Sequence, residues 1–133
     1  NEDGNLAMEV HQALLLARVR AAIAGRDDAP HALDARSACR LATKGGAECL
    51  GRDDCGTLEA GRCMDAACFR VDDLAHAGIR DLVAGLALSP PARAWAVVVA
   101  GRVVVREGRL LTADEDEIAR EIATVSRRLR DAT

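Results

Sequence analysis

The sequence predicts an α/β fold in which helices flank a small β-meander. Three observations support this fold class: helical apolar spacing at 5–24, two β-branched runs separated by a glycine turn at 94–111, and a helix with segregated charges at 112–131. Half of the 133 residues are hydrophobic. That is enough apolar material for one domain core, and the length is short for two domains.

The first predicted element is a long helix at 5–24. Its apolar residues recur every three or four positions, at Leu6, Val10, Ala13, Leu14, Ala17 and Ala21. Asp3 or Asn5 can cap the start of this helix, and Gly25 can end it. Further leucine, valine and isoleucine residues widen the apolar face to almost the full circumference. We therefore expect neighbouring structure to cover the helix on several sides.

Shorter elements are predicted in the middle of the chain. In order, they are a loop at 25–34, two short helical pieces within 35–51, a strand within 63–71, and a short helix or irregular segment at 73–89. Gly45 and Gly46 are expected to break the helix between the two pieces, because glycine is a poor helix former.

The stretch 94–111 is predicted to form three short strands. The valine runs at 97–99 and 103–105 are separated by Ala100-Gly101, and a second turn falls at Glu107-Gly108. Branched residues between short glycine turns are typical of a β-meander.

The last predicted element is an amphipathic helix at 112–131. Thr112 and Glu115 fit the Thr-x-x-Glu capping box. Acidic residues crowd the first turn and arginines the last, which is the order that the helix dipole favours. One apolar stripe is expected, formed by Ile118, Ile122, Val125 and Leu129.

The composition argues against several classes of partner. The net charge is −3 and the only aromatic residues are Phe69 and Trp95. Neither a basic surface nor a base-stacking platform is therefore expected, and we predict no nucleic-acid partner. No apolar run approaches the roughly 20 residues of a membrane span, so we predict no membrane partner. The five cysteines, an odd number without a signal peptide, predict free thiols in the cytoplasm.

The residues by themselves indicate no catalytic or metal-binding constellation. The cysteine spacings are wider than the usual zinc-binding pairs, so we expect the thiols to be buried as small core residues. The three histidines lack metal-ligand spacing, and the paired aspartates lie where turns are expected. Gly45-Gly46 lacks the Gly-Lys-Ser/Thr ending of a phosphate loop.

The segment TKGGAECLGRDDCGTLEAGRCMDAACF at 43–69 nevertheless resembles a known signature, that of the C-terminal part of the amidohydrolase superfamily. The shared positions are Gly46, Ala47, Leu50, Gly51, Gly56, Leu58, Gly61 and Asp65. The segment NEDGNLAMEVHQALLLAR at the start resembles the loop and helix after the last barrel strand in the cytosine deaminase and chlorohydrolase branch. The phrase RVDDLAHAGIRDLVAGLALSPPARA resembles the 8-oxoguanine deaminase subgroup.

The resemblance implies a particular fold. The chain would contain the last helix of a TIM-like (α/β)₈ barrel, the C-terminal half of a small β-sandwich and a C-terminal helix. The corresponding boundaries are 1–51 for the barrel part, 52–112 for the sandwich segment and 113–133 for the final helix.

The resemblance also implies a function. The parent enzyme would be a homo-oligomeric, cytoplasmic, metal-dependent aminohydrolase that deaminates a purine- or pyrimidine-like heterocycle of the 8-oxoguanine type. Zinc or another divalent metal would be bound by residues upstream of Asn1, with no metal ligand and no catalytic residue in this chain. Asn1 is the candidate for the substrate loop, and the isolated chain is expected to be inactive. Two alternatives stay open: a stand-alone β-sandwich interaction module and a small cysteine-rich metal protein.

Overall fold

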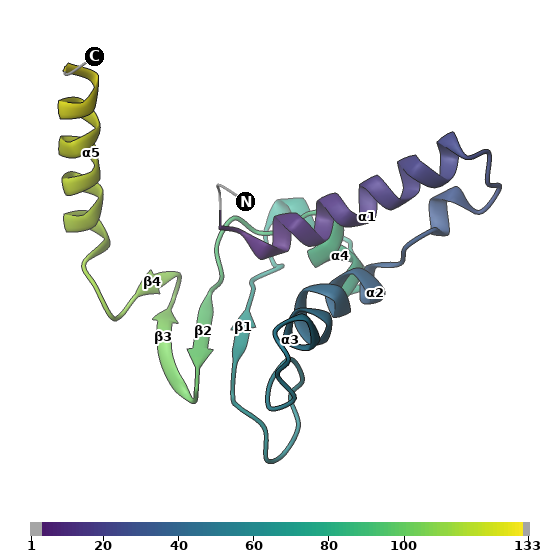
Figure 1. Cartoon of the computed structure of the whole chain (residues 1–133), viewed down its shortest axis with the longest axis horizontal. Coiled ribbons are helices and arrows are strands. Elements are labelled where there is room, and N and C mark those ends of the chain that lie inside the picture. The colour runs from purple at the N-terminus through teal and green to yellow at the C-terminus, as the bar shows by residue number, and fades with distance from the viewer. Residues whose placement is uncertain (1–3, 132–133) are drawn as a thin grey trace.

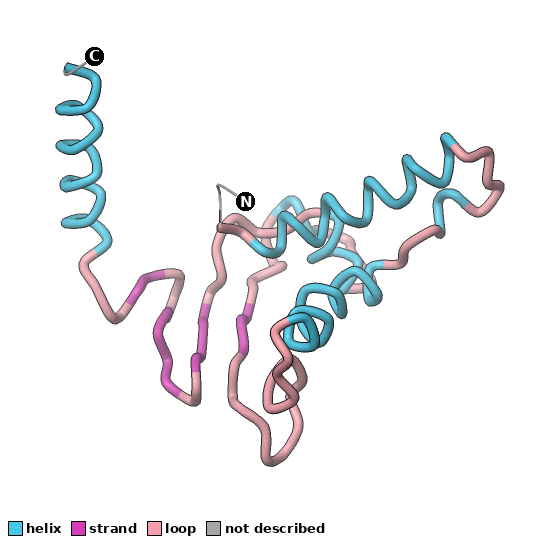
Figure 2. Tube along the Cα trace, viewed as in Figure 1, coloured by secondary structure: helices cyan, strands magenta, loops and turns pink. Residues whose placement is uncertain are grey.

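The computed structural model describes residues 4–131 as a group of helices, a four-stranded sheet and a separate C-terminal helix (Figure 1). The helices are α1 (Leu6–Ile23), α2 (Ala35–Arg40), a π-helical segment (Leu41–Gly45), α3 (Gly46–Cys49), α4 (Leu82–Leu88) and α5 (Glu115–Asp131). Two 3₁₀ turns lie at Ala29–His31 and Leu74–His76. The strands are β1 (Ala66–Cys68), β2 (Ala96–Val99), β3 (Arg102–Arg106) and β4 (Arg109–Leu110). A long loop joins α3 to β1 (Figure 2).

The long first helix is confirmed. The Asn5 carboxamide oxygen accepts hydrogen bonds from the backbone N–H groups of Ala7 (3.1 Å) and Met8 (3.4 Å), so Asn5 is the N-cap. The other predicted cap, Asp3, lies outside the described residues. Gly25 follows the helix with a φ of 68°, a left-handed conformation that commonly ends helices.

The best-packed core lies among the helices. Val10 and Leu14 of α1 pack with Ala38 of α2 and Ala87 of α4, and Leu14 is fully buried. The His11 side chain adds a polar link, because its Nδ1 lies 3.0 Å from the Ala87 carbonyl oxygen. This core therefore joins segments that are more than 70 residues apart in the sequence.

The predicted meander is confirmed, with β1 added to it. The sheet is antiparallel in the order β1-β2-β3-β4. Ala100 (φ 48°) and Gly101 (φ 77°) form the β2–β3 turn, and Glu107 (φ 52°) and Gly108 (φ 74°) form the β3–β4 turn. Two successive positive φ angles are what the twist of a tight two-residue hairpin requires.

The predicted break at Gly45-Gly46 is wrong. Gly45 (φ −61°, ψ −39°) and Gly46 (φ −62°, ψ −43°) both have helical dihedral angles, and the chain passes from α2 through the π-helical segment into α3 without a turn. A Cβ on Gly45 would lie 3.4 Å from the Arg40 carbonyl oxygen. The glycine pair therefore lies within a continuous helical path and does not end it.

The predicted capping box of the last helix is also wrong. α5 begins at Glu115, and its cap is Asp114, whose Oδ1 accepts from the N–H groups of Asp116 (2.9 Å) and Glu117 (3.1 Å). Thr112 lies too early in the chain for this role. Glu115 instead accepts from the Leu110 N–H at 3.3 Å, which links the start of α5 to β4.

Large apolar side chains remain exposed on both long helices. On α1 they are Leu6, Leu15, Leu16, Val19 and Ile23, which agrees with the predicted all-round apolar surface. On α5 they are Ile118, Ile122, Val125 and Leu129, so the predicted stripe is present and uncovered. None of the helices in residues 4–131 has the length and apolar character that crossing a membrane requires. The proposed boundaries at 51/52 and 112/113 remain predictions.

Candidate functional site

The sequence singles out two regions: Asn1, expected in a substrate loop, and the signature at 43–69. Asn1 lies outside the described residues, so its predicted role stays untested. The signature is described in full, and it folds into the end of the π-helical segment, α3, the long loop after it and β1. Its contacts show what this patterned segment does.

Gly56 packs directly against the helical part of the signature. Its φ is +86°, and a Cβ built on it would lie 2.9 Å from Ala47 Cβ, 3.0 Å from Lys44 Cα and 3.1 Å from the Thr43 carbonyl oxygen. Only glycine meets both conditions without strain. At this position the signature glycine therefore serves close packing of the loop on the helix.

Charged side chains on the same loop pair with one another. Arg52 binds the Asp54 carboxylate through two hydrogen bonds of 2.9 and 2.7 Å, and the Cys63 thiol lies 3.2 Å from the same carboxylate. The Arg52 guanidinium holds the pKa of Asp54 far below its usual range. The Asp54 carboxylate in turn raises the pKa of the Cys63 thiol. Cys63 is thus kept protonated, which disfavours both nucleophilic attack and metal binding by this thiol.

A small hollow beside this loop is an unsuitable substrate pocket. Its volume is about 160 Å³, below the roughly 300 Å³ at which ligand sites begin. Its charged lining residues Arg52, Glu59 and Arg62 already take part in ion pairs, Arg62 with Glu59 at 2.9 Å. These ion pairs therefore stabilise the loop.

Asp65, the last of the shared signature positions, links the region before β1 to the β2–β3 turn. Its Oδ1 accepts a hydrogen bond of 2.7 Å from the Ala100 N–H, and the neighbouring Met64 carbonyl accepts one of 3.0 Å from the Gly101 N–H. Asp65 directly precedes β1, and it holds the left-handed β2–β3 turn against that strand. The signature thus connects the helical part of the chain to the sheet.

A second polar cluster surrounds His76, which the sequence pattern did not single out. The imidazole is buried, its Nδ1 faces the Asp73 carboxylate, and its Nε2 lies 2.7 Å from the Ser89 carbonyl oxygen. Both ring nitrogens face acceptors, so the doubly protonated ring can donate to both. The hydrogen bond to Asp73 is the larger cause that raises the pKa of His76 above its ordinary value, and the hydrogen bond to the Ser89 carbonyl is the second. The Asp73-x-x-His76 capping pattern was available in the sequence, but the Ser89 partner depends on tertiary structure.

The His76 cluster should make stability depend on pH near neutrality. Because the folded-state pKa of His76 is raised, its contribution to stability is complete below the unfolded pKa of about 6.5 and is lost as the pH rises through the folded value. The pKa of Asp73 is lowered by His76, so the Asp73 contribution is lost only in acid. We therefore expect the urea midpoint of the natural chain to decrease as the pH is raised from 6 to 8. The urea midpoint of the His76→Gln variant should decrease less over the same pH range. Parallel midpoints for the two proteins across this window would contradict the assigned ion pair.

No metal centre is formed by the described residues. Between residues 4 and 131, no three His, Cys, Asp or Glu side chains are grouped so that they could hold a metal ion. The described part of the chain therefore does not fit the metal that the amidohydrolase resemblance implies. The five cysteines are free thiols, as expected, but none is fully buried, and Cys49 and Cys68 are exposed. Cys39 packs against the core of Val10, Leu14, Ala38 and Ala87, so the prediction that the cysteines are buried core residues holds in part for Cys39 and is wrong for the exposed Cys49 and Cys68.

Comparisons with known proteins agree on one group of enzymes. No protein-family model matches the chain. It is 36% identical over 131 residues to a 5-methylthioadenosine/S-adenosylhomocysteine deaminase of Desulforudis audaxviator, a match that covers 97% of the chain. It is 34% identical over 108 residues to an 8-oxoguanine deaminase of Pseudomonas aeruginosa, which covers 81% of the chain. The crystal structure of atrazine chlorohydrolase from Arthrobacter aurescens TC1 complexed with zinc matches 84% of the chain with a TM-score of 0.74 and 39% identity.

The chain accounts for only a part of these relatives. The matches span 29% and 22% of the two deaminases and 25% of the chlorohydrolase chain. The fold described above is therefore shared with about a quarter of the chlorohydrolase chain.

Proposed function

We propose that this chain, which matches the C-terminal part of amidohydrolase-superfamily enzymes, works as that part of a longer metal-dependent hydrolase that cleaves a C–N bond of a nitrogen heterocycle. The observation that carries the proposal is the deaminase match over 97% of the chain and 29% of the relative. The matched relatives include deaminases and a hydrolase crystallised with zinc.

The exposed surface of α1 supports this assignment. Leu16 and Ile23 have exposed fractions of 60% and 82% although the helix has a fully buried residue, Leu14, on its other side. A single helix with apolar residues on nearly all sides is typical of one enclosed by other structure. In the proposed enzyme, the barrel preceding this chain would supply that cover.

The metal would be held by residues outside the described part of the chain. When bound, a zinc-type metal supplies an activated water for attack on the ring carbon. The residues of this chain have a structural role: Asn5 caps the start of α1, Gly56 packs the signature loop on the helical segment, and Asp65 holds the β2–β3 turn.

We further propose a purine-like substrate that carries an amino group, of the 8-oxoguanine type. Two lines support it: the resemblance of the segment that contains Asp73 and His76 to the 8-oxoguanine deaminase subgroup, and the 34% identity to such a deaminase. The match to a deaminase of adenine-containing compounds supports the same chemical class.

A stand-alone interaction module is the second candidate, favoured by one observation. The chain has a core of its own, formed by Val10, Leu14, Ala38 and Ala87. The contacts of His11 with the Ala87 carbonyl and of His76 with the Ser89 carbonyl add polar links beside this core. A monomeric 133-residue protein that melts cooperatively and binds little hydrophobic dye would support this reading against the hydrolase.

Ammonia release tests the proposal directly. The purified 133-residue chain should release none from 8-oxoguanine, 5-methylthioadenosine or an aminotriazine, with or without zinc, because its described residues contain no metal centre. The longer polypeptide, expressed from the reading frame that includes the codons preceding Asn1, should release ammonia from at least one of them. Turnover by the purified chain itself, or a reading frame without such codons, would refute the proposal.

A further inference from the structure

The most exposed element of the described structure is α5, which points away from the helices and the sheet (Figure 1). None of its residues is buried. Its first turn is held to the rest of the chain by the Glu115 contact with the Leu110 N–H and by ion pairs of Arg93 with Glu115 (3.4 Å) and of Arg109 with Asp116 (3.7 Å). The side chains of the following described turns are largely exposed.

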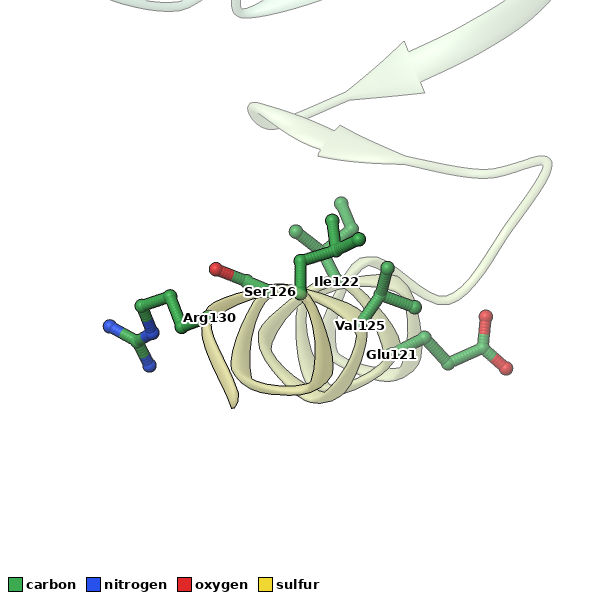
Figure 3. Close-up of a pocket in the computed structure, with 6 residues that line it drawn as sticks. Glu121, Ile122, Val125, Ser126 and Arg130 are labelled. Carbon is green, nitrogen blue, oxygen red and sulfur yellow. The ribbon is translucent and has the colours of Figure 1, made fainter. Parts of the chain in front are cut away.

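The apolar residues of α5 follow a heptad pattern. Ile118, Ile122, Val125 and Leu129 are separated by four, three and four residues, the spacing of a two-helix seam. Figure 3 shows Ile122, Val125 and Ser126 on one side of the helix, with Glu121 and Arg130 beside them. The residues that line this open face all belong to α5: Glu121, Ile122, Val125, Ser126, Leu129 and Arg130. The spacing is that of a helix that pairs with another helix.

The charges of α5 determine which helix would fit. Glu115, Asp116 and Glu117 occupy the first turn, and Arg128 and Arg130 the last. A parallel copy would place like charges together at both ends. An antiparallel copy would place the acidic end of each helix against the basic end of the other, which is the favourable order.

The flanking positions of the seam agree with the antiparallel copy. Glu121 and Arg128 occupy the same heptad position next to the apolar stripe, one heptad apart. In an antiparallel pair centred between Ile122 and Val125, Glu121 would face Arg128 of the partner subunit, and the symmetry would form this ion pair twice. The opposite flank carries the small residues Ala119 and Ser126, which permit close approach of the two helices.

We propose that α5 pairs with α5 of a second copy of this chain in an antiparallel, two-fold symmetric dimer. The stripe of each helix packs on the stripe of the other, and the two Glu121–Arg128 pairs fix the direction and register. An anionic membrane surface is a poorer partner, because acidic residues are more frequent than basic ones along α5. The pairing does not depend on the proposed hydrolase activity, since no residue of α5 takes part in it.

Charge reversal with complementation tests this pairing. By sedimentation over a wide concentration range, the natural chain should form dimers. Glu121→Arg or Arg128→Glu alone should weaken dimerisation by about tenfold or more, because each puts two like-charge pairs beside the seam. An equimolar mixture of the two variants should restore dimers, because both pairs are then of opposite sign.

Matched controls separate this contact from other self-association. Arg127→Glu makes the same charge change on the opposite face of α5 and should leave the dimer unchanged. Ile122→Asp in the seam should abolish the dimer, whereas Ala123→Asp beside it should weaken it much less. A natural chain that is monomeric throughout, single reversals that dimerise normally, a mixture that stays monomeric, or association that survives Ile122→Asp would each overturn the proposal.

Discussion

Replacing Leu14 with Ala should lower the free energy of unfolding by about 3 kcal/mol, within the range seen for fully buried leucines. Leu14 has no exposed surface and lies at the centre of the cluster formed by α1, α2 and α4. Removing its side chain leaves a cavity beside Ala38 and Ala87, which are too small to fill it. The measurement is a urea titration followed by circular dichroism.

Leu16→Ala is the matched control for this substitution. It removes the same atoms from the same helix, but Leu16 is 60% exposed, so the loss should be below about 1 kcal/mol. The comparison cancels the effect of helix propensity, which is equal for the two variants. Equal losses at the two positions would show that α1 is buried on a different face from the one described.

Replacing Gly56 with Ala should cost about 3 kcal/mol, for two reasons that add. The left-handed φ of +86° is unfavourable for alanine, and the new methyl group would overlap Ala47 Cβ and the backbone of Thr43 and Lys44. Because two of the three neighbours are backbone atoms, the loop must move away from α3. The urea midpoint and the near-ultraviolet signal of the chain should both change.

Gly61→Ala separates the two reasons. Gly61 has the same φ of +86°, but no atom lies within 4 Å of the position of an added Cβ. Its replacement should therefore cost only the conformational part, about 1 kcal/mol. If both substitutions cost the same, the close contact between Gly56 and Ala47 does not exist in solution.

Elements that depend on local signals could be predicted from the sequence. The spacing of apolar residues predicted α1 and the α5 stripe, and the Ala-Gly and Glu-Gly pairs predicted both hairpin turns. These features need only information that lies within a few residues. The same is true of Asn5, whose capping bonds reach the next two to three residues.

Features that depend on distant contacts could not be predicted. Local propensity predicts a break at the glycine pair 45–46, whereas the structure continues the helical path through both residues. Thr112 and Asp114 are both competent caps, and the contact of Glu115 with Leu110 decides between them. At the candidate site, the closeness of Gly56 to Ala47 and the second partner of His76 join segments that local patterns do not connect.

The π-helical segment Leu41–Gly45 sets the helical phase of everything that follows it. A π turn holds one residue more than an α turn, and each residue of an α-helix advances by about 100°. Deleting one residue here would restore a regular α-helix and rotate α3 by about that angle relative to α2. Ala47 would then point away from Gly56, and the signature loop would lose its packing contact with α3. The segment therefore tolerates changes of residue type better than changes of length, so that an insertion or deletion of one codon would be far more damaging here than in the loop after Gly25.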